Sequence, residues 1–295
     1  MKVMKNNLAY PLAILDVGSN SVRLMKVDEN GNRNKVTVST RLGEGLSFSK
    51  YLKQEAIMRT VDACVRLYYE GVKFGAKQIY IFATAAVRNS LNGKDFVNEI
   101  KRALNLDVDV VSGDLEGKLA LDGALMGSNG GVIDVGGASS EVCYKNDGQI
   151  SYSYSLEMGA VKLFDACGRD YKKIKELLNS LVCKYGDIPK GNYTAVGGTA
   201  TSLGAISLGL TEYDPNVVHG HYISRLKLEQ ITTELFSLTP SEICNRYCVG
   251  KKRADIIAGG SAIMLSILQY ANLDGVTISE NDNLEGYLLY LGGKI

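Results

Sequence analysis

The chain has 295 residues, a length that predicts about two domains at roughly 150 residues each. Its 33 lysines and arginines nearly balance its 32 aspartates and glutamates, and this net charge of +1 argues against a strongly basic nucleic-acid-binding protein. The 32 glycines, beside only 4 prolines, exclude a Pro/Gly-rich low-complexity chain and indicate tight turns or close backbone approaches.

The first half of the chain predicts a three-stranded antiparallel meander followed by alternating helices and strands. Apolar runs and alternation indicate strands, and apolar residues at helical spacing indicate helices. We expect strands at residues 12–17, 22–27, 35–40, 79–83 and 108–111, and helices at residues 54–74 and 94–104. The apolar run before Asp16 is short and contains Pro11, so it predicts a first strand rather than a secretion signal.

The second half repeats this order of elements. We expect strands at residues 131–135, 141–144, 150–156 and 193–196, and a helix near residues 170–185. The sequence Asp-Val-Gly-Ser-Asn-Ser at residues 16–21 resembles Asp-Val-Gly-Gly-Ala-Ser at residues 134–139, and each follows a short apolar strand. The repeat predicts a duplicated domain with a cleft between the halves and a boundary near residues 119–131.

The repeated Asp-x-Gly segments have a chemical use at the end of a buried strand. Glycine lets a phosphate approach the backbone, consecutive N–H groups can bind an anion, and an aspartate can hold hydrated Mg²⁺. Two such loops facing one cleft would hold a phosphate from both sides. A third turn, Gly197-Gly198-Thr199, opens a helix whose N-terminus favours anions, although an ordinary strand–helix turn with a threonine cap is the better explanation of this segment alone.

Several other functional motifs are absent. No Gly-Lys pair is followed by Ser or Thr, and neither G-x-S-x-G nor HExxH occurs. The two histidines, His219 and His221, make a poor metal site. The six cysteines form no C-x-x-C pair and predict a reduced, cytoplasmic protein, in which Cys244 and Cys248 would share one helix face for packing. No apolar stretch reaches the roughly 20 residues that a bilayer requires, so no membrane contact is expected.

A family resemblance rests on segments that run in order over nearly the whole chain. They are residues 16–24, 82–88, 112–113 with Glu116, 134–141, 155–163, 197–203, 219–220 and 253–255. Through them the chain resembles the exopolyphosphatase / guanosine pentaphosphate phosphohydrolase family of the actin-like phosphotransferase superfamily, in its short two-domain form. The resemblance implies two actin-like (ribonuclease H-like) α/β domains around a cleft, each with a mixed five-stranded sheet and flanking helices. We expect them at residues 1–121 and 122–295, with the last few residues packing back on the first domain.

The resemblance also implies Mg²⁺-dependent release of terminal orthophosphate from inorganic polyphosphate or guanosine pentaphosphate. Glu116 stands where the family keeps its catalytic glutamate, which would orient and deprotonate the attacking water. The implied phosphate-binding residues are Gly18, Ser19, Asn20, Arg23, Gly136, Gly137, Ser139, Gly198, Thr199 and Arg253. Asp134 would hold Mg²⁺, with Glu141 and Asp16 nearby. From the residues alone, Glu116 is a solvated residue near a helix start, and the two arginines are equally well surface ion pairs.

Three positions depart from the family pattern. Ala138 replaces a glycine, Leu115 replaces an acidic residue beside Glu116, and Glu285 replaces an arginine. The methyl group of Ala138 is tolerable if its backbone has an ordinary φ angle. The reversed charge at Glu285 predicts weaker binding of a long polyanion. Arg88 lies in a family segment, but the sequence assigns it no role.

Two other functions remain open at this stage. One is a kinase or ATPase of the same superfamily that acts on a sugar or another small molecule, since the fold does not separate the two. The other is a non-catalytic sensor of polyphosphate or guanosine nucleotides. No nucleic-acid partner is expected, and a homodimer is the default oligomeric state.

Overall fold

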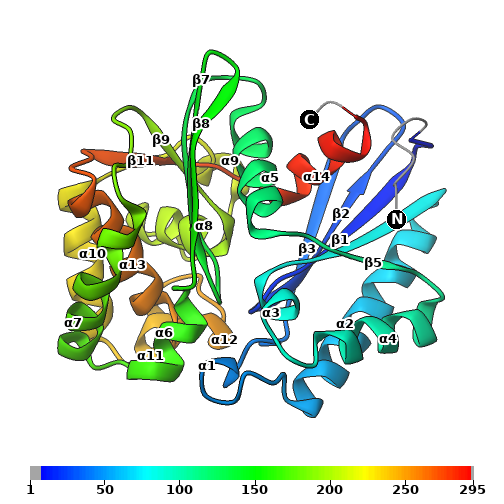
Figure 1. Cartoon of the computed structure of the whole chain (residues 1–295), viewed down its shortest axis with the longest axis horizontal. Helices are drawn as coiled ribbons and strands as arrows, with labels where there is room; N and C mark the ends of the chain where they lie inside the picture. The colour runs from blue at the N-terminus through cyan, green and yellow to red at the C-terminus, as the bar shows by residue number, and fades with distance from the viewer. Residues whose placement is uncertain (1–7, 294–295) are drawn as a thin grey trace.

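The computed structural model describes residues 8–293, which fold into two α/β lobes (Figure 1). Within these residues the first lobe has a five-stranded mixed sheet of order β3-β2-β1-β4-β5. Its strands are β1 (Leu12–Val17), β2 (Ser21–Val27), β3 (Arg33–Ser39), β4 (Gln78–Ala83) and β5 (Val108–Val110). Strand β1 is antiparallel to β2 and parallel to β4, and the predicted meander is confirmed.

The second lobe repeats this arrangement with one more strand than expected. In the described part of the chain its sheet has six strands in the order β10-β11-β9-β6-β7-β8. They are β6 (Gly130–Val135), β7 (Ser140–Asn146), β8 (Gln149–Leu156), β9 (Tyr193–Val196), β10 (Tyr222–Ser224) and β11 (Gly275–Ile278). Strands β10 and β11 were not predicted, since three or four residues are too few to show a pattern. The expected fold class of two mixed sheets with flanking helices is confirmed.

Helices cover the sheets of both lobes (Figure 1). Those that precede the second lobe are α1 (Leu46–Ser49), α2 (Gln54–Lys73), α3 (Ala85–Arg88), α4 (Gly93–Leu104) and α5 (Gly113–Leu125). Those that follow β8 are α6 (Ala160–Cys167), α7 (Tyr171–Leu181), the 3-10 helix η1 (Val182–Tyr185), α8 (Gly197–Ser207), α9 (Pro215–Val218), α10 (Arg225–Ser237), α11 (Pro240–Arg246), α12 (Lys251–Ala254), α13 (Ile257–Tyr270) and α14 (Asn283–Leu291). The predicted helix near residues 170–185 is therefore α7 continued by η1.

The apolar stretch at residues 256–268 lies inside the second lobe. It forms α13, which is buried on nearly every side against α6, α7, α8 and α10. A helix that is apolar all round needs such a fully buried position. No helix between residues 8 and 293 has both the length and the apolar character to cross a membrane.

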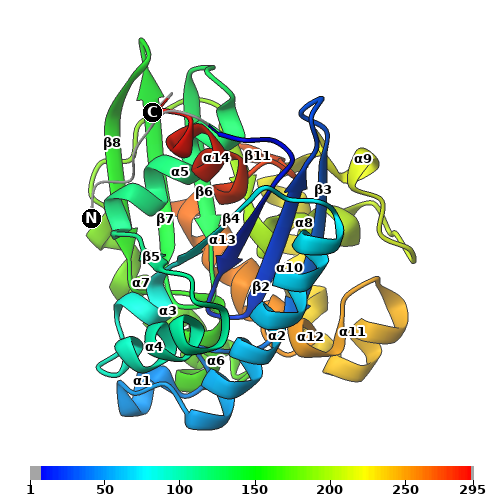
Figure 2. The same cartoon turned by 90° about the vertical axis from the view of Figure 1, so that its right-hand side faces the viewer.

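Helices α5 and α14 connect the lobes and lie side by side (Figure 2). Their backbones touch at glycines: a Cβ atom on Gly123 would lie 2.1 Å from the Asp282 carbonyl oxygen. Tyr287 of α14 stacks on Phe82 of β4, with ring centroids 4.4 Å apart. Helix α14 thus packs on the first lobe, although it follows the second lobe in sequence. The boundary at residues 121/122 falls inside α5 and stays a prediction, and residues 294–295 lie outside the described chain.

The six cysteines are free thiols. Cys244 lies on α11, but that helix ends at Arg246, and Tyr247 is extended. The prediction that Cys244 and Cys248 share a helix face is therefore wrong. Cys248 instead lines the cleft between the lobes.

Candidate active site

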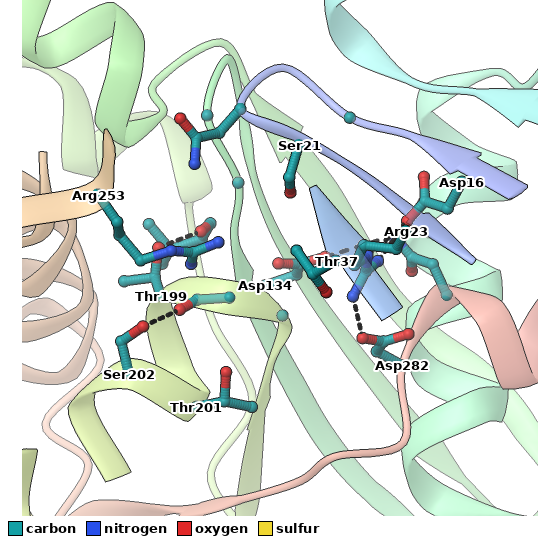
Figure 3. Close-up of a pocket in the computed structure, with 18 of the residues that line it drawn as sticks. Asp16, Ser21, Arg23, Thr37, Asp134, Thr199, Thr201, Ser202, Arg253 and Asp282 are labelled. Atoms are coloured by element: carbon teal, nitrogen blue, oxygen red, sulfur yellow. Dashed lines mark hydrogen bonds and ion pairs between the residues drawn. The ribbon is translucent and has the colours of Figure 1, made fainter. Parts of the chain in front are cut away.

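A cleft of about 960 Å³ lies between the two lobes, and most of the predicted site residues line it (Figure 3). Its walls come from residues 18–20 and 136–139, the start of α8, the β3 strand and residues 280–285. The predicted residues that line it are Asp16, Gly18, Ser19, Asn20, Arg23, Glu116, Asp134, Gly136, Gly137, Ser139, Gly198, Thr199 and Arg253. Glu141 does not line it. The roles given to these residues stay predictions.

The two repeated loops fold the same way. In the first, the Gly18 N–H donates to the Ser21 carbonyl oxygen at 2.9 Å, and in the second the Gly136 N–H donates to that of Ser139 at 3.0 Å. The loops also touch, because a Cβ atom on Gly137 would lie 2.7 Å from the Ser19 Cβ. A larger residue at position 137 would therefore force the two lobes apart.

Asn20 is an unsatisfied polar group at the point where the loops meet. Its side chain is buried, yet neither its amide nitrogen nor its amide oxygen has a partner among the described residues. Leaving such a group unpaired costs about 1–3 kcal/mol, so it indicates a ligand. The side chain lines the cleft and can donate to a phosphate oxygen.

Arg253 supplies a positive charge that no carboxylate neutralises. It makes no ion pair with any residue between 8 and 293, and it lines the cleft beside α8 (Figure 3). Gly198 allows this position, since a Cβ atom there would lie 1.9 Å from the Arg253 Nη1. Burial, with some repulsion from Arg23, lowers the pKa of Arg253 to about 10. The guanidinium thus stays charged at neutral pH and is available to an anion.

Arg23 differs from Arg253 because two carboxylates hold it. It donates from Nε to Asp16 at 3.0 Å and forms ion pairs with both Asp16 and Asp282 (Figure 3). Burial lowers the pKa of Arg23, but the two carboxylates outweigh it and raise the pKa overall. Burial raises the pKa of Asp282, but the nearby charges of Arg23 and Lys35 lower it by more. The pKa of Asp282 therefore lies below its usual value. The structure therefore presents Arg23 as a bridge between carboxylates. Sequence reasoning did not single out Asp282, although Asp282 and Glu285 form a capping box.

Thr199 has a structural partner. Its hydroxyl donates to the Val135 carbonyl oxygen at 2.7 Å, which ties the start of α8 to the strand that leads into the second loop. Gly197, two residues before Thr199, has a φ of +78° and faces Asp134. Glycine is required there because a side chain would meet both steric strain and that carboxylate.

Glu116 lies at the start of α5, where its carboxylate reaches the cleft. Ser112 caps the helix by accepting from the Leu115 N–H at 3.2 Å. Arg88 donates from Nη1 to the Glu116 Oε2 at 2.7 Å and to the Val111 carbonyl oxygen at 2.9 Å. Burial raises the pKa of Glu116, and the Arg88 charge opposes the rise. The structure thus gives Arg88 the partner that the sequence did not reveal.

Asp134 and Glu141 stand opposite each other in the β6–β7 pairing. Burial, with repulsion from Glu116, Asp282 and Asp16, raises the pKa of Asp134 to about 8, with Arg23 opposing the rise. Burial and the neighbouring charges of Glu116 and Asp134 raise the pKa of Glu141 well above its usual value. Glu141 accepts from the Ser155 hydroxyl at 2.6 Å. Glu141 is buried and lies outside the lining of the cleft.

The predicted Mg²⁺ ligands do not form a closed cage. Among the described residues, no three Asp, Glu, His or Cys side chains gather as a metal site would require. Mg²⁺ keeps most of its waters and needs only one or two carboxylates beside substrate phosphates. Asp16 fits this, since its Oδ1 is buried and has no partner in the described chain. Asp134 fits as well, because it is buried and makes no ion pair with residues 8–293.

The departures from the family pattern have clear structural settings. Ala138 does not have a positive φ angle, since the non-glycine residues between positions 8 and 293 that do are other ones. Its methyl group therefore causes no backbone strain. Glu285 is buried and accepts from Lys35 at 2.8 Å, so it neutralises a cation at the cleft wall. His219 and His221 each hydrogen bond within the protein, to the Glu280 N–H at 3.2 Å and the Ser207 hydroxyl at 2.9 Å.

Comparison with known proteins gives one family. The model described as the Ppx/GppA phosphatase family matches residues 32–292. A bifunctional 3-dehydroquinate synthase/phosphatase of Fusobacterium nucleatum is 29% identical, over 97% of this chain and 47% of that protein. Exopolyphosphatase 2 of Mycobacterium tuberculosis is 27% identical, over 96% of this chain and 98% of that protein. A guanosine-5'-triphosphate,3'-diphosphate pyrophosphatase of Photobacterium profundum is 25% identical, over 99% of this chain and 61% of that protein.

The chain thus spans about half the length of the Fusobacterium relative and nearly all of the mycobacterial one. Among solved structures, the Aquifex aeolicus member of the Ppx/GppA family superposes with a TM-score of 0.77. It is 25% identical, and the match covers 96% of this chain and 97% of that one. The actin-like arrangement of the two lobes is therefore shared over nearly the full length of the match.

Proposed function

The chain belongs to the Ppx/GppA phosphatase family, and on that premise we propose that it hydrolyses a terminal phosphoanhydride bond and releases orthophosphate. One observation carries the proposal: the buried carboxylate of Glu116 faces the same cleft as the unpaired guanidinium of Arg253. A carboxylate can activate water, and a cation can hold the phosphate that the water attacks. The names of the relatives suggest inorganic polyphosphate and guanosine pentaphosphate as the substrates.

The substrate would bind through its phosphates. Arg253 and the Asn20 amide would contact phosphate oxygens, and the glycine loops at residues 18–20 and 136–139 would let them approach the backbone. Because the two loops touch, phosphate oxygens held by one loop would lie close to the other. This geometry requires no binding pocket for the rest of the molecule, so it suits both substrate classes.

Glu116 would act on water. Its carboxylate accepts a proton as the water oxygen bonds to the terminal phosphorus and the bridging P–O bond breaks, leaving the electron pair on the shortened chain. Arg88 keeps Glu116 oriented and favours its ionised form. Asp134 and Asp16 would hold Mg²⁺, which supplies charge neutralisation to the phosphates.

Phosphate release from the purified protein tests this proposal. Guanosine pentaphosphate, long-chain polyphosphate and ATP would be compared, each with Mg²⁺ and again with EDTA. We expect Mg²⁺-dependent release from at least one of the first two and little from ATP. Release from none of the three would reject the hydrolase and favour the sensor. Rapid turnover of ATP alone would favour the kinase or ATPase.

A change at Arg88 is expected to shift the pH dependence of the reaction. Besides Arg88, the charged groups near Glu116 are Asp16, Asp134 and Glu141. The charge of Asp16 raises the pKa of Glu116, and the charge of Glu116 raises the pKa values of Asp134 and Glu141. Arg88→Gln removes the opposing charge, so the pKa of Glu116 rises further and less of it is ionised at acidic pH. We expect about a tenfold loss of kcat on the acid side and a smaller loss at alkaline pH.

A kcat profile against pH measures this effect. Arg88→Lys should restore most of the acid-side rate, because it keeps the charge although it loses the planar donor geometry. A uniform loss of kcat at every pH, with no recovery in the lysine variant, would show that Arg88 acts in some way other than on the ionisation of Glu116.

A further inference from the structure

Residues 39–45, which begin at the last residue of β3, hydrogen bond to the first glycine loop, at residues 18–20. The Gly43 N–H donates to the Ser19 carbonyl oxygen at 2.8 Å. The N–H groups of Thr40 and Arg41 both donate to the Asn20 carbonyl oxygen at 2.9 Å. A shift of residues 39–45 would therefore carry the unpaired Asn20 side chain with it.

The same segment is bound to the second lobe. Arg41 forms an ion pair from Nη1 to the Asp255 Oδ2 at 2.5 Å, and Lys252 donates to the Ser39 carbonyl oxygen at 2.8 Å. The Gly45 N–H donates to the Asp165 carboxylate of α6 at 2.6 Å. These contacts join residues 39–45 to α6, to α12 and to Asp255 just after it. Helix α1, which follows these residues, lies next to α6 in Figure 1.

The partner of Arg41 is close to the phosphate-binding cation. Asp255 directly follows α12, two residues after Arg253. The Arg41 N–H group thus bonds to the backbone of Asn20. The Arg41 guanidinium bonds to the turn that positions Arg253. Its φ of +54° is unusual for a residue with a side chain, and such a conformation persists only where the surroundings hold it.

The ion pair is incomplete. The Arg41 Nε and the Asp255 Oδ1 are buried, and neither has a hydrogen-bond partner among the described residues, although the Arg41 Nε lies 3.8 Å from the Glu44 Oε2, at ion-pair distance. Arginine and carboxylate pair best through two parallel hydrogen bonds. A small approach of the two lobes that makes the pair bidentate would satisfy both atoms at once.

We propose that Arg41 is a positioning residue whose pair with Asp255 sets the spacing between Asn20 and Arg253, and so the closure of the cleft on a phosphate chain. This assignment rests on the proposed function only for its kinetic part, because closure on a polyphosphate anion is a binding event. The pair tightens when the anion bridges the lobes and loosens when the anion leaves.

The test uses Arg41→Gln, Asp255→Asn and the double variant of the full chain. Tripolyphosphate with Mg²⁺ is the probe, and its affinity is measured by calorimetry beside KM and kcat for phosphate release. We expect each single variant to bind tripolyphosphate about tenfold more weakly and to raise KM similarly, with kcat changed far less. The double variant should be no weaker than the single ones, because both changes remove the same contact.

Arg102→Gln is the matched control, since Arg102 pairs with Glu99 at 2.6 Å on α4, away from the cleft. It should leave the affinity and KM unchanged. Additive losses in the double variant, or unchanged tripolyphosphate affinity in the single ones, would overturn the proposal. A fall in thermal stability and kcat at constant affinity would do so too. If the wild type releases no phosphate, the proposed function fails, while the binding measurement still decides the role of Arg41.

Discussion

Replacing Glu116 by glutamine is expected to slow phosphate release by about 10²–10⁴-fold, the usual contribution of a general base. Glutamine keeps the size and can still accept from Arg88 Nη1, which lies 2.7 Å from the carboxylate oxygen. It has no basic oxygen to take the proton of the attacking water. Substrate affinity should change only a few-fold, because the phosphate contacts assigned to Arg253 and Asn20 remain.

Single-turnover phosphate release and calorimetric binding measure the two effects separately. Glu99→Gln is the matched control, because Glu99 also pairs with an arginine but lies on the outer face of α4. It should release phosphate at the wild-type rate. If Glu116→Gln releases phosphate as fast as the wild type, Glu116 is not the base. Tight substrate binding together with equally slow phosphate release in the wild type and in Glu116→Gln would favour the sensor.

Replacing Asp134 by asparagine is expected to have opposite effects on stability and on activity. Asp134 is a buried carboxylate with no ion pair in the described chain, and burial raises its pKa to about 8. The unfolded chain carries this charge in water from about pH 4 upward, so the fold loses stability as the pH rises, and the full cost of the buried charge is reached above pH 8. The variant should therefore melt about 2–4 °C higher without metal. It should lose the stabilisation that Mg²⁺ gives, and release phosphate at least about 100-fold more slowly.

Thermal melts at alkaline pH, with and without Mg²⁺, measure this prediction. Asp122→Asn is the control: Asp122 is equally buried but accepts from the Lys145 ammonium at 2.8 Å. Its loss leaves the half-buried lysine without a counter-charge, so that variant should melt lower under both conditions. A lower melting temperature for Asp134→Asn without metal, or an unchanged response to Mg²⁺, would contradict the assignment of Asp134 to the metal.

The repeat of Asp-Val-Gly at residues 16–18 and 134–136 was sufficient to predict two similar lobes with a cleft between them. The reason is local: a short apolar run followed by glycine indicates a buried strand that ends in a turn, and β1 and β6 are such strands. Most of the residues that the family resemblance implied for the site line the cleft as well. The strand β10 was missed because three residues carry no periodicity.

The long-range charge pairs could not be predicted, because their partners lie far apart in the sequence. Arg23 and Asp282 are 259 residues apart, and Arg41 and Asp255 are 214 apart. Glu141 shows the opposite error: it lies only two residues after Ser139, but it does not line the cleft. Proximity along the chain therefore identified the loops correctly and did not identify which charges are free.

The packing of α14 on the first lobe has a consequence for the order in which the protein can fold during synthesis. Leu284 and Tyr287 cover an apolar face that includes Leu12 and Phe82, and these residues are made long before them. The ribosome therefore completes the second lobe while that face of the first lobe is still uncovered. Such a surface is prone to aggregation in a nascent chain. That face of the first lobe thus reaches its native packing only after α14 has left the exit tunnel, whereas the core on the side of α2 and α4 contains no residue of α14.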